Sequence, residues 1–211
     1  MLSASHKSPL GHIAAQLIVR NHMQPIVHTS REREFITYSE HWHTSKVLLM
    51  LGVESERGSY HQFLASIVFT AFTLEAFLNH MGEHLFSLWP EMEKLAPKAK
   101  LLLICEKLNI EVDFSRLPWQ IIPKLFGVRN KIAHGKNELL KDERELGAES
   151  YDELLGKMLR TKWQEYGTQE NAQDARDQVA ALCEIIWDKS DFPHHGLFQF
   201  GLQSHAAYVK S

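Results

Sequence analysis

The chain has 211 residues, 44% of them hydrophobic, which is enough for one folded domain with a full core. Its formal net charge of −3 at pH 7 excludes a general electrostatic attraction to nucleic acid, so any such contact has to be local. No hydrophobic run approaches the length of about eighteen residues typical of a membrane span, and Met1 to Leu17 show no signal-peptide pattern. Cys105 and Cys183 fall in apolar helical patterns, as buried free thiols do. We therefore expect a water-soluble, cytoplasmic protein.

The first part of the chain is predicted to be helical. Hydrophobic residues at helical spacing indicate an amphipathic helix over residues 8–23, which Pro25 ends. Residues 26 to about 39 are predicted to form a linker, followed by a helix over about residues 40–54. We assign residues 1–58 to an N-terminal helical extension.

The longest predicted element is a helix over residues 59–88. Its apolar residues form a continuous stripe, and phenylalanines make the other sides nearly as apolar, which is typical of a central helix buried on most sides. Glu75 lies in the middle of the stripe. A single carboxylate is therefore expected on a face that should be buried.

The rest of the chain completes an all-α bundle. Further helices are predicted over residues 97–109, 149–163 and 171–189, and we assign residues 59–190 to the bundle. The tail, residues 191–211, is predicted to be irregular but packed on the bundle through three hydrophobic side chains: Leu197, Phe198 and Phe200.

The most informative stretch runs from Gly127 to Lys136, on the last turns of a predicted helix. Pro123 suits the first turn of that helix, where a missing N–H does no harm. Gly135 suits its end, because glycine adopts the left-handed conformation that other residues avoid. The helix then carries three polar side chains near its exposed end: Arg129, Asn130 and His134.

Arg129 falls within the apolar stripe of this helix, whereas Asn130 and His134 lie four residues apart on the wetter face. An unpaired buried charge is strongly destabilising, so Arg129 needs a partner. We predict an ion pair with Glu75. This pair either locks two helices in register or orients an active-site arginine.

Charge is segregated around the same helix. Residues 124–136 hold four lysines or arginines and no acid, whereas residues 138–153 hold seven acids and two basic residues. The basic patch coincides with the polar cluster, to which Lys131 and Lys136 add positive charge. The local charge that a nucleic-acid contact would require is therefore present beside the cluster.

Arg129-Asn130 followed by His134 resembles the Arg-x4-6-His signature of the HEPN superfamily, in which a polar residue commonly follows the arginine. The ending Ala133-His134-Gly135, the long apolar helix that contains Leu74 to Asn79 and the all-α pattern are also similar to HEPN proteins. The resemblance covers roughly residues 59–190. It implies a HEPN-like helical bundle.

Many HEPN proteins are metal-independent endoribonucleases of toxin–antitoxin, abortive-infection and other defence systems, and others are non-catalytic binding modules. The resemblance implies a homodimeric endoribonuclease that cleaves RNA without a cofactor and has an antitoxin or a nucleotidyltransferase as a partner protein. It assigns catalysis to Arg129, Asn130 and His134, supported by Glu75, Lys131 and Lys136.

The chemistry of these side chains points the same way. Metal-independent RNA cleavage requires a base for the 2′-hydroxyl proton, an acid for the leaving 5′-oxygen and positive charge on the phosphorane. Histidine can act as acid or base near neutral pH, and arginine can hold two phosphate oxygens. One motif supplies a single histidine, so we expect a two-fold dimer that brings two copies of His134 into one cleft.

Two alternatives concern the same residues. His134 and Asn130 would also suit a cation near a helix C-terminus and a polar surface residue without chemistry. The whole fold could then be a non-catalytic helical module that binds RNA or a partner protein. An acidic stretch folded over the basic patch would repel RNA and favour this second function.

Metal binding is a further alternative, because the chain has 13 histidines. His80 and His84 are four apart on the central helix, a spacing that can chelate zinc, with Glu83 between them. Zinc proteases, however, place the glutamate directly after the first histidine, where this chain has Met81. Nothing in the sequence brings two other histidine pairs to this place: His41 with His43, and His194 with His195. We expect no metal.

Overall fold

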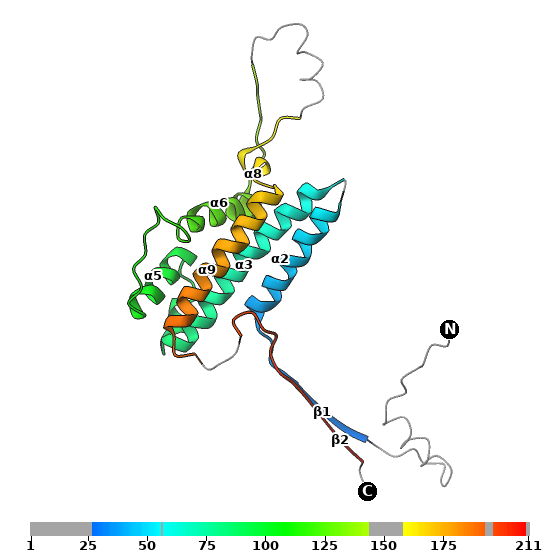
Figure 1. The fold of residues 1–211 in the computed structure, drawn as a ribbon, viewed down its shortest axis with the longest axis vertical. Helices are drawn as coiled ribbons and strands as arrows, with labels where there is room; N and C mark the ends of the chain where they lie inside the picture. Colours follow the sequence, from blue (N-terminus) through cyan, green and yellow to red (C-terminus); the bar gives the residue numbers. More distant parts are fainter. Residues whose placement is uncertain (1–26, 56, 144–157, 193–195, 210–211) are drawn as a thin grey trace, which may run out of the picture. The chain divides into compact units, whose positions relative to one another are not determined.

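The structure is a computed structural model that describes residues 27–55, 57–143, 158–192 and 196–209. These ranges hold seven helices and two strands (Figure 1): β1 Val27–Arg33, α2 Thr37–Glu54, α3 Ser59–Leu85, α4 Trp89–Met92, α5 Pro97–Lys107, α6 Ile121–His134, α8 Lys162–Glu165, α9 Gln169–Lys189 and β2 Gln203–Val209. The chain is mostly helical, as predicted. The helix expected over residues 8–23 lies outside the described residues.

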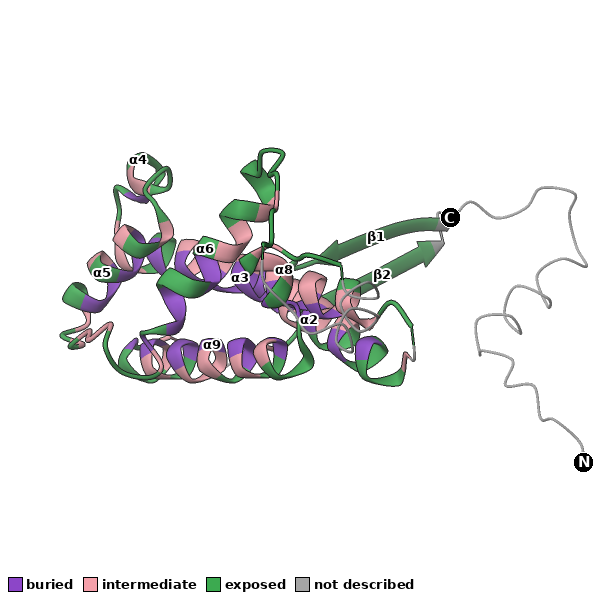
Figure 2. Cartoon of the chain, turned by 90° about the horizontal axis from the view of Figure 1, so that it is seen from above, coloured by how far each residue is buried: buried purple, intermediate pink, exposed green. Residues whose placement is uncertain are grey.

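The helices form one compact unit over residues 36–200, with α3 at its centre. α3 contacts α2, α5, α6 and α9 (Figure 1), and its buried side chains include Ile67, Leu74, Phe77 and Met81. Figure 2 shows the buried positions along α3 and α9. The central helix predicted for residues 59–88 is therefore confirmed, and it ends at Leu85.

α3 is also long and apolar enough to span a membrane, which the sequence analysis did not anticipate. Half of its most apolar window, 50%, is buried within the unit. The core helix of a bundle is also apolar on most of its circumference, so length and composition alone do not make α3 a membrane span.

α2 belongs to the bundle and not to an N-terminal extension. It begins at Thr37, a few residues before the predicted start, and packs against α3 along its length. Tyr38 and Leu49 of α2 are part of the core. The boundary that the sequence places at residue 58 therefore falls inside the bundle, which begins at residue 36.

The helix predicted over residues 149–163 differs from the structure in its described part. Residues 158–161 are not helical, and α8 begins only at Lys162. Thr161 is the N-cap: its hydroxyl accepts a hydrogen bond from the Gln164 N–H, and the Gln164 side chain accepts one from the Thr161 N–H. This capping box starts a new helix at a place that periodicity alone does not mark.

Residues 1–35 and 201–211 form the second unit, in which β1 and β2 are described. The two strands pair in antiparallel register, from Val27 opposite Val209 to Arg33 opposite Gln203. The sequence predicts a linker and an irregular tail here, and both predictions are wrong. The partner of each strand lies at the other end of the chain, and such pairing leaves no local signal.

The first part of the tail follows the prediction more closely. Phe198 stacks on Trp42 with ring centroids 4.2 Å apart, and its carbonyl oxygen lies 3.0 Å from His43 Nε2. Phe200 stacks on the ring of His43 at 4.2 Å. The tail aromatics therefore hold residues 196–200 to α2 within the bundle.

Candidate functional site

The polar cluster is carried by α6, whose first half is anchored in the core. Ile121, Ile122, Leu125 and Phe126 are buried. Pro123 occupies the third helical position, in agreement with the prediction that it suits the first turn. The second half of the helix turns toward solvent, so its polar side chains are accessible while its start is held in place.

Gly135 follows the last helical residue, but it is not left-handed as predicted. Its φ and ψ are −58° and 140°, values that any residue adopts. A Cβ atom at this position would instead overlap the carbonyl oxygen of Lys131. Glycine fits here because it has no Cβ atom to overlap the carbonyl oxygen of the preceding helical turn, and not because of a positive φ.

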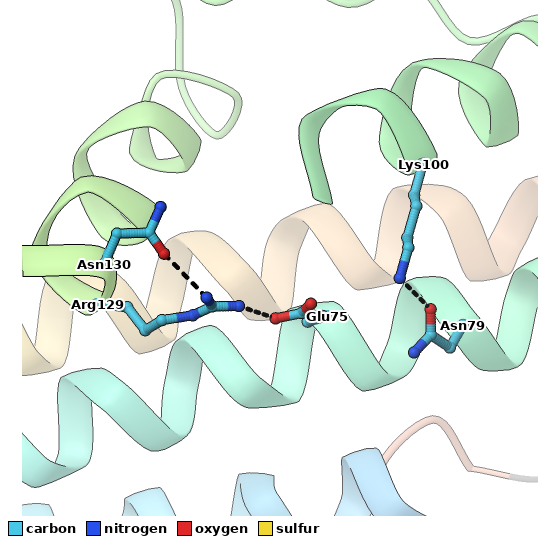
Figure 3. Close-up of polar contacts among 5 residues, drawn as sticks. All are labelled: Glu75, Asn79, Lys100, Arg129 and Asn130. Atoms are coloured by element: carbon cyan, nitrogen blue, oxygen red, sulfur yellow. Dashed lines mark hydrogen bonds and ion pairs between the residues drawn. The ribbon is translucent and has the colours of Figure 1, made fainter. Parts of the chain in front are cut away.

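Arg129 and Glu75 form an ion pair, as predicted (Figure 3). Arg129 Nη2 donates to Glu75 Oε2, and the two side chains are 19% and 29% exposed. Because both groups are largely removed from water, their attraction is screened less than that of a surface pair. The pair joins α6 to the central helix in the immediate neighbourhood of the polar cluster.

The guanidinium of Arg129 has contacts on several sides. Nη1 donates to the Asn130 side-chain oxygen at 2.9 Å, and the carbon atom Cζ lies 5.9 Å from the Phe72 ring centre and 5.6 Å from that of Phe126. The sequence places Asn130 beside His134 on the wetter face of the helix, whereas in the structure its side-chain oxygen contacts Arg129. Asn130 therefore helps to orient the guanidinium together with Glu75.

A pocket of about 510 Å³ opens beside the end of α6. Asn130 and His134, both exposed, line it together with Lys131 and Lys136. Arg129 is not a lining residue, but its hydrogen bond to Asn130 places it directly behind the wall. The structure thus brings all predicted site residues into one neighbourhood, with three cationic or titratable side chains facing the space.

One acid also lines the pocket. Glu138, the first residue of the acidic stretch, lies on its wall, whereas the part of that stretch from residue 144 onward is outside the described residues. A carboxylate here lowers the positive potential that attracts phosphate. The pocket is therefore basic in balance but not uniformly so.

A second cation, which was not predicted from the sequence, approaches the same face of α3. Lys100 of α5 is only 2% exposed, and its Nζ donates to the Asn79 side-chain oxygen at 2.7 Å (Figure 3). Asn79 lies four residues after Glu75 and so on the same face of the helix. The sequence feature that could have indicated this contact is the position of Lys100 on the otherwise apolar, inward-facing stripe of α5.

The other candidate groups do not assemble into a site. Within the described ranges, no three metal-ligating side chains of His, Cys, Asp or Glu lie together, and His194 and His195 fall outside these ranges. His80 and His84 pack on Phe192, with ring centroids 4.9 and 4.3 Å apart. Both cysteines are free and buried as predicted, and burial raises the pKa of the Cys105 thiol to about 12.

The chain matches no family model, no curated protein and no solved structure.

The ion pair should stabilise the fold measurably. Arg129→Ala is expected to lower the free energy of unfolding by about 1–3 kcal/mol, because it leaves Glu75 without its counter-charge in a largely dehydrated place. The effect should stay below the loss of about 3–5 kcal/mol that accompanies breaking a fully buried pair, since both side chains keep some contact with water. Urea unfolding measures the change.

A double-mutant cycle isolates the pair. Glu75→Ala combined with Arg129→Ala should cost less than the sum of the two single changes, because the second removal no longer orphans a charge. Glu83→Ala is the matched control, since Glu83 is an exposed glutamate on the same helix. Strictly additive single effects would show that the pair contributes nothing beyond its separate side chains.

Proposed function

We propose that the chain is a HEPN-type, metal-independent endoribonuclease that acts as a homodimer in the cytoplasm, with a role in toxin–antitoxin or phage-defence biology. The proposal rests on one observation: an exposed histidine, an amide and two lysines line one pocket, and an ion-paired arginine lies behind it. This set contains the groups that phosphodiester cleavage requires. The helical bundle around it is consistent with the resemblance in the sequence.

The reaction can be written with balanced protons. Neutral His134 of one subunit removes the 2′-hydroxyl proton, and the 2′-oxygen attacks phosphorus. The P–O5′ bond breaks, and the partner subunit's His134, protonated beforehand, donates its proton to the leaving 5′-oxygen. The products end in a 2′,3′-cyclic phosphate and a 5′-hydroxyl. Arg129 and the lysines stabilise the charge on the phosphorane.

The surface beside the site supports the dimer. Half-buried aromatic rings continue from the Arg129 guanidinium: Phe72 lies 5.8 Å from Phe69, which lies 5.7 Å from His41. Burial lowers the pKa of His41, although Glu40 acts in the opposite direction. Aromatic side chains are enriched in the cores of protein interfaces, so a second copy seated here would bury apolar surface next to the motif.

Glu138 favours a second candidate function. A carboxylate on the pocket wall would repel a phosphodiester, as expected for a non-catalytic HEPN-like module that binds RNA weakly or binds a partner protein instead. We rank this function second because four other side chains on the wall can donate hydrogen bonds to an anion.

Incubation with RNA in EDTA tests the proposal. The purified chain is expected to cleave single-stranded RNA and to leave 2′,3′-cyclic phosphate ends, identified by mass spectrometry, at a rate that EDTA does not reduce. Deoxyribonucleotides at every position should prevent cleavage, because the attacking 2′-hydroxyl is then missing. RNA that is bound but stays intact would support the second function, and cleavage that stops in EDTA would contradict the first.

A further inference from the structure

The two-stranded ribbon presents an accessible surface. Residues 28–33 of β1 and 203–208 of β2 are all exposed (Figure 2). An isolated pair of strands is only marginally stable in water, because it buries little apolar surface. The ribbon therefore contributes little to a hydrophobic core.

Because successive side chains of a strand point to opposite faces, the arginine and glutamate side chains of the ribbon lie on different faces. One face, which we name the basic face, carries the side chains of Thr29, Arg31, Arg33, Gln203, His205 and Ala207. Arg31 is directly opposite His205, so the two basic groups are cross-strand neighbours. The other face carries Glu32. The basic face has no carboxylate among its described residues.

The basic face ends in an aromatic ring. Glu34 N–H donates to the Leu202 carbonyl at 2.9 Å, so the pairing continues one step beyond the strands. Phe35 is 59% exposed, and the Arg33 guanidinium lies 5.3 Å from its ring centre, on the same face. A guanidinium plane and a ring beside each other offer two surfaces on which a base can stack.

We infer that the basic face of the ribbon binds single-stranded RNA. Arg31 and Arg33 contact phosphate, and an unpaired base stacks on Phe35. The choice of RNA among nucleic acids rests on the proposed function, whereas the binding itself does not involve His134. A single strand fits better than an RNA duplex, because the major groove of A-form RNA is too narrow to admit side chains.

Charge complementarity favours RNA over a second copy of the chain. Among the described side chains of the basic face, Phe35 is the single large apolar one, so burying this part of the face against another protein would gain little from the hydrophobic effect. A flexible polyanion, by contrast, meets guanidinium groups and loses its counterions on binding. Pairing of two copies through strand edges is a different outcome, which the experiment below also reports.

Fluorescence anisotropy with a labelled single-stranded RNA tests the inference, with every variant built on His134→Ala so that the RNA stays intact. The full chain with Arg31→Ala and Arg33→Ala is expected to bind roughly tenfold more weakly, and its salt slope should fall by about 1.4, or 0.7 for each lost phosphate contact. Phe35→Ala should weaken binding roughly five- to a hundredfold, the range for one stacked base.

Two controls locate the effect on the ribbon. Lys46→Ala with Arg57→Ala removes two exposed charges from the bundle and should change affinity much less. Exchanging neighbours, with Ser30→Arg and Arg31→Ser, keeps the composition but moves a guanidinium to the other face, and should weaken binding as Arg31→Ala does. Size-exclusion chromatography with light scattering follows the oligomeric state of each variant.

Unchanged affinity in the double arginine variant overturns the inference, and so does an equal loss in the bundle control. A change of oligomeric state without a change in RNA affinity would instead assign the ribbon to pairing between copies. Equal affinity for single-stranded DNA leaves the site but removes its preference for RNA. None of these outcomes depends on cleavage, so the proposed ribonuclease activity can fail or hold independently.

Discussion

Replacing His134 with alanine is expected to lower the rate of RNA cleavage by about 10²–10⁴-fold, the usual effect of losing a general acid or base. The reason is that the pocket has no other described histidine on its wall. In a two-fold dimer the same substitution removes both the proton acceptor and the proton donor. The cleavage rate of a fluorescent RNA in EDTA measures the effect.

The fold should survive this change. His134 is exposed on the last turn of α6, so alanine there should lower the free energy of unfolding by at most about 1 kcal/mol. His61→Ala is the matched control, an exposed histidine on α3 that does not line the pocket, and it should retain full activity. Added imidazole should restore part of the activity of His134→Ala, since the pocket is open to solvent. An unchanged cleavage rate in His134→Ala removes the assignment.

The sequence predicts the motif helix and its ion pair because both leave local signals. Periodicity places Arg129 and Glu75 on stripes that have to be buried, and two opposite charges in such places require each other. The same periodicity identifies α3 as the central helix. The contact between Lys100 and Asn79 could not be predicted in this way, because a lysine on an apolar stripe can usually extend its ammonium group to solvent. In the structure, Lys100 is buried instead.

The remaining differences have non-local causes. β1 and β2 pair across the whole chain, and short alternating stretches indicate a strand only when a partner is known. Gly135 has no Cβ atom that would overlap the Lys131 carbonyl oxygen, and residue spacing in the sequence cannot reveal this contact. α2 joins the core through contacts with α3, whereas its own sequence is too mixed to show which side is buried.

Arg176 of α9 is a buried arginine that the sequence did not reveal. It is 5% exposed, and its guanidinium carbon lies 3.7 Å from the Trp42 ring centre. Nη1 donates to the Trp42 carbonyl at 2.9 Å and to the Ser45 hydroxyl. Trp42 is therefore held between this guanidinium and the ring of Phe198. The groups named here that contact the Arg176 guanidinium are uncharged: a carbonyl, a hydroxyl and an indole ring.

Arg176→Ala is expected to lower the free energy of unfolding by about 2–4 kcal/mol, because it leaves a cavity beside Trp42. The Trp42 carbonyl keeps a hydrogen bond from the Ser45 hydroxyl at 2.8 Å, so little is lost through unsatisfied polar groups. Arg176→Met should cost less than about 1 kcal/mol, since methionine fills the space against the ring and removes a charge that burial disfavours. Guanidinium chloride unfolding compares both variants with the wild type.

Burial of the Arg176 guanidinium also determines how its contribution to the free energy of unfolding depends on pH. Burial lowers the pKa of Arg176 to about 10, although Asp177 acts in the opposite direction. The folded chain therefore binds this proton less tightly than the unfolded chain does, which lowers the free energy of unfolding. This loss of stability is fully present below about pH 10, and it decreases only as the pH rises beyond that value. Across the neutral range, the stability difference between Arg176→Met and the wild type should not change with pH. If methionine proves as destabilising as alanine, the guanidinium contributes through its hydrogen bonds and not through its packing on Trp42.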